Sequence, residues 1–230
     1  MRRPLVIEFE TAGFSYGTTP ILEETTLALA PGSFHFLIGP SGAGKSTFLR
    51  LCYRDLLPTT GAVRFFGRVI PPSDRDGIAD LRRVVGVVHQ DAQFLGHLSL
   101  VENIALPLQV SGIDLADRAG DLRALLEWVD LTGRVEALPG TLSGGERQRA
   151  AVARAVILSP EVILADEPTG NLDRDMAMRV LSLLVELNRM GKTVLIATHD
   201  LDLIRAAKSR VQARVLRLAG GRIQLAGADL

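Results

Sequence analysis

The segment from Gly39 to Thr47 reads Gly-Pro-Ser-Gly-Ala-Gly-Lys-Ser-Thr and constrains the fold more than any other part of the chain. It fits the pattern G-x-x-x-x-G-K-[ST], which requires a buried strand before it and a helix after it. The apolar run Phe34–Ile38 precedes the segment, and the helix-competent stretch 46–51 follows it. This order of strand, loop and helix is typical of proteins that hold the phosphates of a nucleoside triphosphate.

Each part of this phosphate loop has an expected role. Glycine tolerates positive φ, so the backbone can turn successive N–H groups towards an anion, and the helix N-terminus adds partial positive charge. Lys45 can reach the outer phosphates, and the hydroxyl of Ser46 is placed to ligate the Mg²⁺ that accompanies the nucleotide. A glycine-rich turn that matches by chance is the alternative, which the flanking strand and helix disfavour. The residues expected to hold the nucleotide are Gly39, Pro40, Ser41, Gly42, Ala43, Gly44, Lys45, Ser46 and Thr47.

The composition favours a globular protein that acts away from nucleic acid. The chain has 230 residues, and Lys+Arg and Asp+Glu are 26 each, so no strong net charge attracts a polyanion. A single cysteine, Cys52, excludes an internal disulfide and suits a reducing compartment. The apolar stretch near the N-terminus is stopped by Glu8, and no apolar run approaches the roughly 18 to 20 residues that cross a bilayer. We therefore expect a cytoplasmic protein whose membrane role depends on a partner.

The strand and helix patterns predict a single domain, 1–230, of the α/β class. Short strands begin and end the chain, and a helix over 174–190 carries a regular apolar face. The pattern is helical between 91 and 160, where we expect an inserted helical subdomain. The expected strands are 6–9, 27–30, Phe34–Ile38, 62–66, 84–88, 162–165, Thr193–Ala197, 211–218 and Arg222–Leu225.

Two adjacent carboxylates follow the buried strand expected at 162–165. Burying them costs free energy unless a cation lies near, and Mg²⁺ is the cation that a bound nucleotide brings. We expect Asp166 to hold the metal through water. On an extended backbone, the side chain of Glu167 points in a different direction from that of Asp166. We expect Glu167 to polarise the water that attacks the terminal phosphorus.

Two further polar side chains are expected at the same edge of the sheet. Gln90 follows the strand at 84–88 and can offer its amide oxygen to Mg²⁺ or to the attacking water; a solvated loop residue is the alternative. His199 follows Thr193–Ala197, and doubly wound sheets bind ligands at the carboxyl ends of their strands. A lone histidine is usually structural, but this position favours contact with the terminal phosphate.

A tyrosine and a second glycine-bearing turn can also contact a nucleotide. Tyr16 lies in an expected loop, where it is either a plain surface residue or a platform on which adenine stacks. Residues 143–146 lead into a helix expected over 149–158 and form another helix N-terminus suited to an anion. Ser143 also fits an N-cap whose capping box Glu146 completes, and the two roles are compatible. The residues of this turn are Ser143, Gly144, Gly145 and Glu146.

The apolar pair Phe94 and Leu95 lies between the catalytic sheet and the expected helical subdomain. One alternative is that both pack under the subdomain. The other is that at least one is exposed and lines a groove for a helix of a membrane partner, to which Gln90 would pass the state of the terminal phosphate. The sequence leaves the two alternatives open.

In chain order, the phosphate loop, Gln90, Leu142-Ser-Gly-Gly-Glu146, Asp166-Glu167 and His199 resemble the nucleotide-binding subunit of an ABC ATPase over nearly the whole chain. The resemblance implies ATP and Mg²⁺ as cofactors and a mostly parallel sheet with an N-terminal antiparallel β layer and an inserted helical subdomain. It matches Tyr16 with the adenine-stacking aromatic, residues 143–146 with the family signature and Asn171-Leu-Asp173 with a dimer-contacting loop. His199 corresponds to the switch histidine. The residues that the resemblance places in catalysis are Glu167, His199, Gln90 and Lys45.

The resemblance also implies partners. The family places the phosphate loop of one copy against the signature of another, so ATP is expected to assemble a homodimer. An integral membrane subunit would hold it at the cytoplasmic face of the inner membrane. The chain is most similar to cell-division ATPases in the segments 39–44, 102–107 and 166–173. ATPases of lipoprotein release and macrolide export share the sequence of residues 170–173. His89 and Arg147 depart from these relatives.

Two other uses of such an ATPase are disfavoured. DNA-organising or repair proteins split the ATPase head with a long coiled coil, and no sustained heptads occur between Gly39 and Leu142. Ribosomal factors carry two cassettes, whereas this chain has one phosphate loop and one signature.

Overall fold

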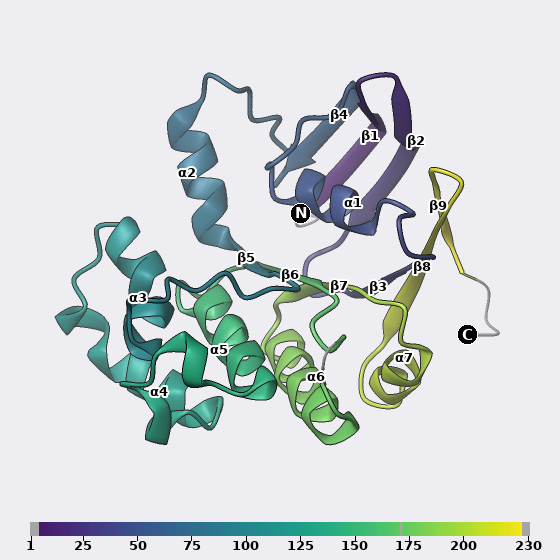
Figure 1. Ribbon diagram of the computed structural model, residues 1–230. Helices are drawn as coiled ribbons and strands as arrows, with labels where there is room; N and C mark the ends of the chain where they lie inside the picture. The colour runs from purple at the N-terminus through teal and green to yellow at the C-terminus, as the bar shows by residue number, and fades with distance from the viewer. Residues whose placement is uncertain (1–4, 171, 227–230) are drawn as a thin grey trace.

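Two β-sheets lie on either side of the helix that follows the phosphate loop (Figure 1). The computed structural model describes residues 5–170 and 172–226. The three-stranded sheet is antiparallel, with the order β2-β1-β4. The six-stranded sheet has the order β5-β6-β7-β3-β8-β9 and is parallel apart from β9, which pairs antiparallel with β8. The strands are β1 (Ile7–Tyr16), β2 (Thr19–Leu29), β3 (Phe34–Ile38), β4 (Thr60–Phe65), β5 (Val85–Val88), β6 (Val162–Asp166), β7 (Thr193–Ala197), β8 (Ala213–Ala219) and β9 (Arg222–Leu225).

The helices are divided between the two faces of the six-stranded sheet. Helix α1 lies between the sheets, while α5, α6 and α7 cover the other face, with α3 and α4 beyond α5 (Figure 1). The bounds are α1 (Lys45–Cys52), α2 (Arg75–Val84), α3 (Leu100–Val110), α4 (Ala119–Trp128), α5 (Gly144–Val156), α6 (Arg174–Arg189) and α7 (Leu201–Lys208). Short 3-10 turns are η1 (Ala116–Arg118), η2 (Thr132–Arg134) and η3 (Pro139–Thr141).

Two apolar clusters hold these layers together. One joins α1 to both sheets, and within it the rings of Phe9 and Phe48 stack with centroids 4.7 Å apart. The other joins the opposite face of the six-stranded sheet to α5, α6 and α7. Each fully buried aromatic or branched side chain contributes about 1.5 to 3 kcal/mol, so the phosphate loop is anchored by cores on both of its flanks.

The structure confirms the predicted fold class and corrects two local assignments. The strands Phe34–Ile38, Thr193–Ala197 and Arg222–Leu225 have the predicted bounds. The expectation that Tyr16 lies in a loop is wrong, because Tyr16 is the last residue of β1 and pairs with Thr19. The polar stretch before β5 contains a helix, α2, that the sequence analysis did not predict. Its signals are the cap at Asp74, whose side chain accepts from the N–H of Gly77, and the basic residues of its last turn.

The helical character of the middle of the chain agrees with the expectation for 91–160, where α3, α4 and α5 lie. Its division from the rest as a subdomain stays a prediction, and α5 packs into the same core as the sheet. Across residues 5–170 and 172–226, the structure has no helix that combines the length and apolar character needed to cross a membrane.

Candidate functional site

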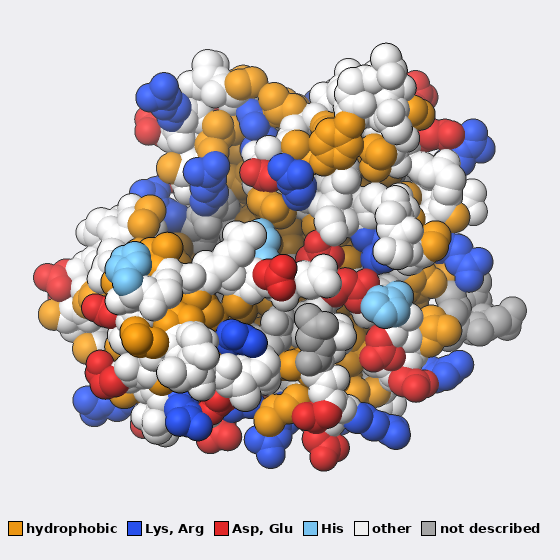
Figure 2. Space-filling view, in the orientation of Figure 1, with side chains coloured by type: hydrophobic (Ala, Val, Ile, Leu, Met, Phe, Trp, Pro, Cys, Tyr) orange, Lys and Arg blue, Asp and Glu red, His pale blue; other side chains and the backbone are white. Residues whose placement is uncertain are grey.

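A cavity of about 760 Å³ opens at the carboxyl ends of β3, β6 and β7. Acidic side chains gather beside a histidine near the middle of this face of the molecule (Figure 2). Because neighbouring parallel strands end at one edge, they bring together side chains from distant parts of the sequence. The residues that line the cavity are Tyr16, Ile21, Ser41, Gly42, Gly44, Lys45, Ser46, Thr47, Gln90, Asp166, Glu167, Gly170 and His199.

The phosphate loop requires glycine at two positions. A Cβ on Gly39 would lie 2.5 Å from the carbonyl oxygen of Leu218, too close for any side chain. Gly44 has φ of 102° and caps α1 without a side-chain hydrogen bond, and a Cβ there would meet Ile21. Gly44 therefore gives the first N–H groups of α1 no side-chain cap, and these groups can donate to an anion at the helix N-terminus.

Lys45 crosses the loop and points to the acidic side of the cavity. Its Nζ donates to the carbonyl oxygens of Gly39 at 2.9 Å and Pro40 at 3.3 Å. The same nitrogen lies 3.6 Å from Oε1 of Glu167, and the two side chains are only 10% and 12% exposed. A pair this buried depends strongly on its partners, so removing the ammonium leaves the carboxylate without its counter-charge.

Glu167 is held in an unusual backbone conformation. Its φ is 44°, so the expectation of an extended backbone is wrong: β6 ends at Asp166, and the chain turns there. The N–H of Glu167 donates to the carbonyl of Ala197, which fixes the turn against the end of β7. Such strained positions persist where surrounding contacts determine them and are common at functional sites.

The carboxylate of Glu167 has one occupied oxygen and one free oxygen. Oε1 lies 2.9 Å from Nδ1 of His199, whose side chain is 72% exposed. Oε2 is buried without a hydrogen-bond partner in the described part of the chain. An unpaired buried carboxylate oxygen costs free energy, so Oε2 is a candidate acceptor for a molecule bound in the cavity.

Asp166 is half-buried at the end of β6. Burial raises the pKa of its carboxyl, the hydrogen bond with the Ser46 side chain lowers it, and the charge of Glu167 raises it again. The structure thus joins the first hydroxyl of α1 to the acid at the end of β6. Together with Gln90, which lines the same cavity, they supply a set of oxygen atoms that could bind a cation.

Tyr16 and Gln90 lie at the margins of the cavity. The exposed Tyr16 ring packs edge-on against Phe14 with centroids 4.8 Å apart, and its hydroxyl accepts from Nη1 of Arg50 at 3.2 Å. Gln90 also lines a neighbouring groove of about 410 Å³ together with Phe94 and Gly144. Leu95, which follows Phe94 but does not line the groove, is 41% exposed. Phe94 is half-buried beneath the guanidinium of Arg154, so one of the apolar pair is exposed and the other packs.

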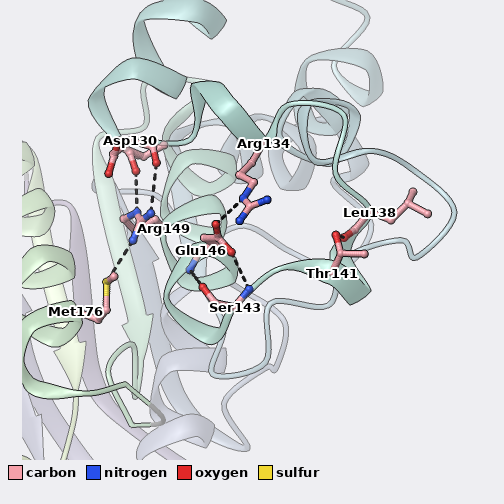
Figure 3. A network of polar contacts seen from close by, with 9 residues as sticks. Asp130, Arg134, Leu138, Thr141, Ser143, Glu146, Arg149 and Met176 are labelled. Carbon is pink, nitrogen blue, oxygen red and sulfur yellow. Dashed lines mark hydrogen bonds and ion pairs between the residues drawn. The ribbon is translucent and has the colours of Figure 1, made fainter.

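The turn at residues 143–146 lies outside the cavity that Lys45 and Glu167 line. The predicted capping box is confirmed: the N–H of Glu146 donates to Ser143 Oγ at 3.2 Å, and the N–H of Ser143 donates to Glu146 Oε2 at 2.8 Å. Figure 3 shows Arg134 reaching the same carboxylate, a contact that the sequence analysis missed because Arg134 belongs to no motif.

The expected dimer-contacting loop is described only in part. Asn171 lies outside the described residues. Asp173 is the N-cap of α6, and its Oδ1 accepts from the N–H of Met176 at 2.9 Å. Met176 in turn packs against Gly145 and receives a contact from Nη1 of Arg149 at 3.2 Å (Figure 3). The beginnings of α5 and α6 are therefore packed together.

Comparison with known proteins identifies the class of this site. Residues 22–170 match the ABC transporter family. The cell division ATP-binding protein FtsE of Haemophilus influenzae is 42% identical over 202 residues, which cover 87% of this chain and 93% of that protein. FtsE of Escherichia coli K12 is 40% identical and covers 95% of this chain and 97% of its own length.

Other relatives and solved structures give the same family. The methionine import ATP-binding protein MetN 2 of Burkholderia mallei is 40% identical over 87% of this chain and 52% of its own length. The dimeric structure of MJ0796, a bacterial ABC transporter cassette, superimposes with a TM-score of 0.84 at 31% identity and covers 95% of this chain and 96% of that one. The chain belongs to the ABC transporter family and is an ATPase of that class.

Proposed function

We propose that this chain is the ATP-hydrolysing subunit of an FtsE-type membrane complex that acts in cell division, with an integral membrane partner similar to FtsX. One observation carries the proposal: Lys45, Asp166, Glu167 and His199 line one cavity at the carboxyl ends of adjacent strands. The FtsE relatives, which this chain covers nearly end to end, support the choice within the family.

Nucleotide binding rests on the phosphate loop and Tyr16. The loop 39–47 binds the phosphates of ATP. The binding groups are the first N–H groups of α1, which Gly44 leaves without a side-chain cap, and the Nζ of Lys45. The exposed ring of Tyr16 lies on the rim of the same cavity and stacks on the base. Such stacking contributes about 1 to 3 kcal/mol per base, so Tyr16 sets affinity without reading the phosphates.

Mg²⁺ fits the donor set of the cavity. Ser46, Gln90 and Asp166 supply only oxygen atoms, which hard cations prefer. Within residues 5–170 and 172–226, no three His, Cys, Asp or Glu side chains are grouped to hold a metal. The chain therefore provides few ligands, as in sites where phosphate oxygens and waters complete the coordination. When bound, the ion neutralises charge on the phosphates, and Asp166 and Ser46 orient it.

Glu167 activates the water in this proposal. His199 and Lys45 hold Oε1, while the unpaired Oε2 accepts a proton from the attacking water. His199 contacts the terminal phosphate from its exposed position and keeps the carboxylate oriented. Gln90 lies between the cavity and the neighbouring groove, so it can report the state of the phosphate to a partner in that groove.

A second copy of the chain completes each site. The turn at residues 143–146 lies outside the cavity that the same chain provides, and a cassette similar to this chain has been solved as a dimer. In the proposed homodimer, the signature turn of one copy closes on the nucleotide of the other. Two chains then make two sites.

Capture of the membrane partner tests the subfamily. A tagged Glu167→Gln chain, crosslinked in the cell of origin with ATP bound, is purified from detergent-solubilised membranes, and the captured proteins are identified by mass spectrometry. An FtsX-like permease is the expected result. A permease for methionine, lipoprotein or macrolide would overturn the cell-division assignment and leave the ATPase class intact. Lys45→Ala serves as the control that cannot hold the nucleotide.

A further inference from the structure

Arg134 forms an ion pair with Glu146, the last residue of the signature turn at 143–146 (Figure 3). Arg134, at the end of η2, donates from Nε to Oε1 of Glu146 at 2.7 Å. The other carboxylate oxygen, Oε2, accepts from the N–H of Ser143 at 2.8 Å. A single carboxylate thus joins η2 to the first turn of α5.

Glu146 brings a full negative charge to this turn. The hydrogen bonds from the Ser143 backbone and from Arg134 lower the pKa of Glu146 to about 2. A negative charge in the first turn of a helix favours the helix itself. It also repels any other anion at the same end, and the proposed role of this turn is to receive the triphosphate held by a second copy.

We propose that Arg134 is a positioning residue for the ATP-driven dimer: it balances the charge of Glu146 and holds its carboxylate against the Ser143 backbone. This inference rests on the proposed function. With the carboxylate fixed, Ser143 Oγ accepts the N–H of Glu146 and keeps its own proton to donate to a phosphate.

Arg134 is exposed, so a role in assembly can be distinguished from a role in folding stability. Its side chain is 55% exposed, and exposed ion pairs contribute little to folding stability. Its removal is therefore expected to change association with an anion far more than folding. Arg189 provides a matched control, because it is 54% exposed and pairs with Glu186 at 2.6 Å near the end of α6.

The test measures how much ATP is needed for dimerisation in the Glu167→Gln background, by light scattering. Arg134→Ala should raise the half-maximal ATP concentration about tenfold while nucleotide binding by the dilute monomer stays unchanged. Arg189→Ala should have no effect. In a chain that also carries Glu146→Gln, which keeps an acceptor for Ser143 but no charge, Arg134→Ala should change the midpoint less than about twofold. High salt should shrink the effect of Arg134→Ala alone.

The outcomes separate this inference from the proposed function. No effect of Arg134→Ala would overturn the inference. A tenfold effect that persists with Glu146→Gln would also overturn it, because Arg134 would then act without Glu146. Failure of the Glu167→Gln parent itself to dimerise with ATP would instead contradict the proposed homodimer, whatever Arg134 does.

Discussion

The two anion-suited helix N-termini of this chain, those of α1 and α5, differ in how their first N–H groups are satisfied. At α1, Gly44 provides no side-chain cap, and Lys45 lies beside the open amides in a cavity. At α5, the hydroxyl of Ser143 and the carboxylate of Glu146 form a complete capping box outside that cavity. The first N–H groups of α1 have no side-chain cap, whereas those of α5 are capped within the chain.

Because of this difference, we expect one chain to bind nucleotide by itself, and we expect a second copy to complete the site at which ATP is hydrolysed. The α1 terminus gains most from a phosphate, because its N-cap, Gly44, has no side chain that could accept from its first amides. The capped α5 terminus carries the negative charge of Glu146, and in the proposed dimer Arg134 balances that charge when a phosphate approaches. We therefore propose that the α1 terminus binds the nucleotide and that the α5 terminus acts in assembly of the dimer.

The largest expected effect concerns the chemistry next to α1. Glu167→Gln keeps the shape of the side chain and removes the proton acceptor, so turnover should fall on the order of 10² or more while Mg-ATP binding persists. Steady-state phosphate release and nucleotide binding by fluorescence measure the two quantities. Turnover near that of the parent would show that Glu167 is not the base.

Lys45→Ala should break the α1 terminus as a binding site. The change removes the ammonium that lies over the loop carbonyls and 3.6 Å from Glu167, so ATP affinity should fall at least tenfold. Titration of the monomer with a fluorescent ATP analogue measures this loss. Ser143→Ala, at the α5 terminus, is the control and should leave monomer affinity within about twofold. Equal losses for the two variants would contradict the division of roles.

Leu95→Ser probes the exposed surface next to Phe94, which lines the groove of about 410 Å³. Gly144 and Glu167 both line that groove, and the backbone of Leu95 is fixed by two hydrogen bonds with Asn103 while its side chain is 41% exposed. Loss of the side chain should therefore weaken recruitment to membranes that contain the partner about fivefold, without unfolding the chain. Flotation with vesicles measures recruitment, and Leu225→Ser on β9 is the exposed control. Unchanged recruitment would exclude Leu95 from the partner surface.

The smallest expected effect is on stability. Burial raises the pKa of Asp166, so its ionised form is disfavoured in the folded state, and stability rises as pH falls through the folded pKa. Asp166→Asn should raise the unfolding temperature of the nucleotide-free chain by about 2 °C at neutral pH, after allowance for solvent screening at this half-exposed site. The gain should vanish at acidic pH. Calorimetry at two pH values would show a constant or absent difference if burial is not the cause.

The features that could be predicted from the sequence are those set by residues close together in the chain. The strand before the phosphate loop and the capping box at Ser143 are local, and both are confirmed. Helix α2 was missed because its polar composition hides its apolar spacing. Contacts set by tertiary structure were beyond the sequence: the left-handed φ of Glu167 depends on Ala197, and the Arg134 contact depends on how η2 packs on α5.

The assembly state of the ATP-bound chain tests the comparison of α1 and α5 most directly. Light scattering on Glu167→Gln should show a monomer without nucleotide and a dimer with ATP. Adding Ser143→Arg, which places a bulky cation in the α5 turn, should abolish the dimer while each monomer still binds ATP through α1. A dimer that forms equally well without ATP, or that survives Ser143→Arg, would contradict the account.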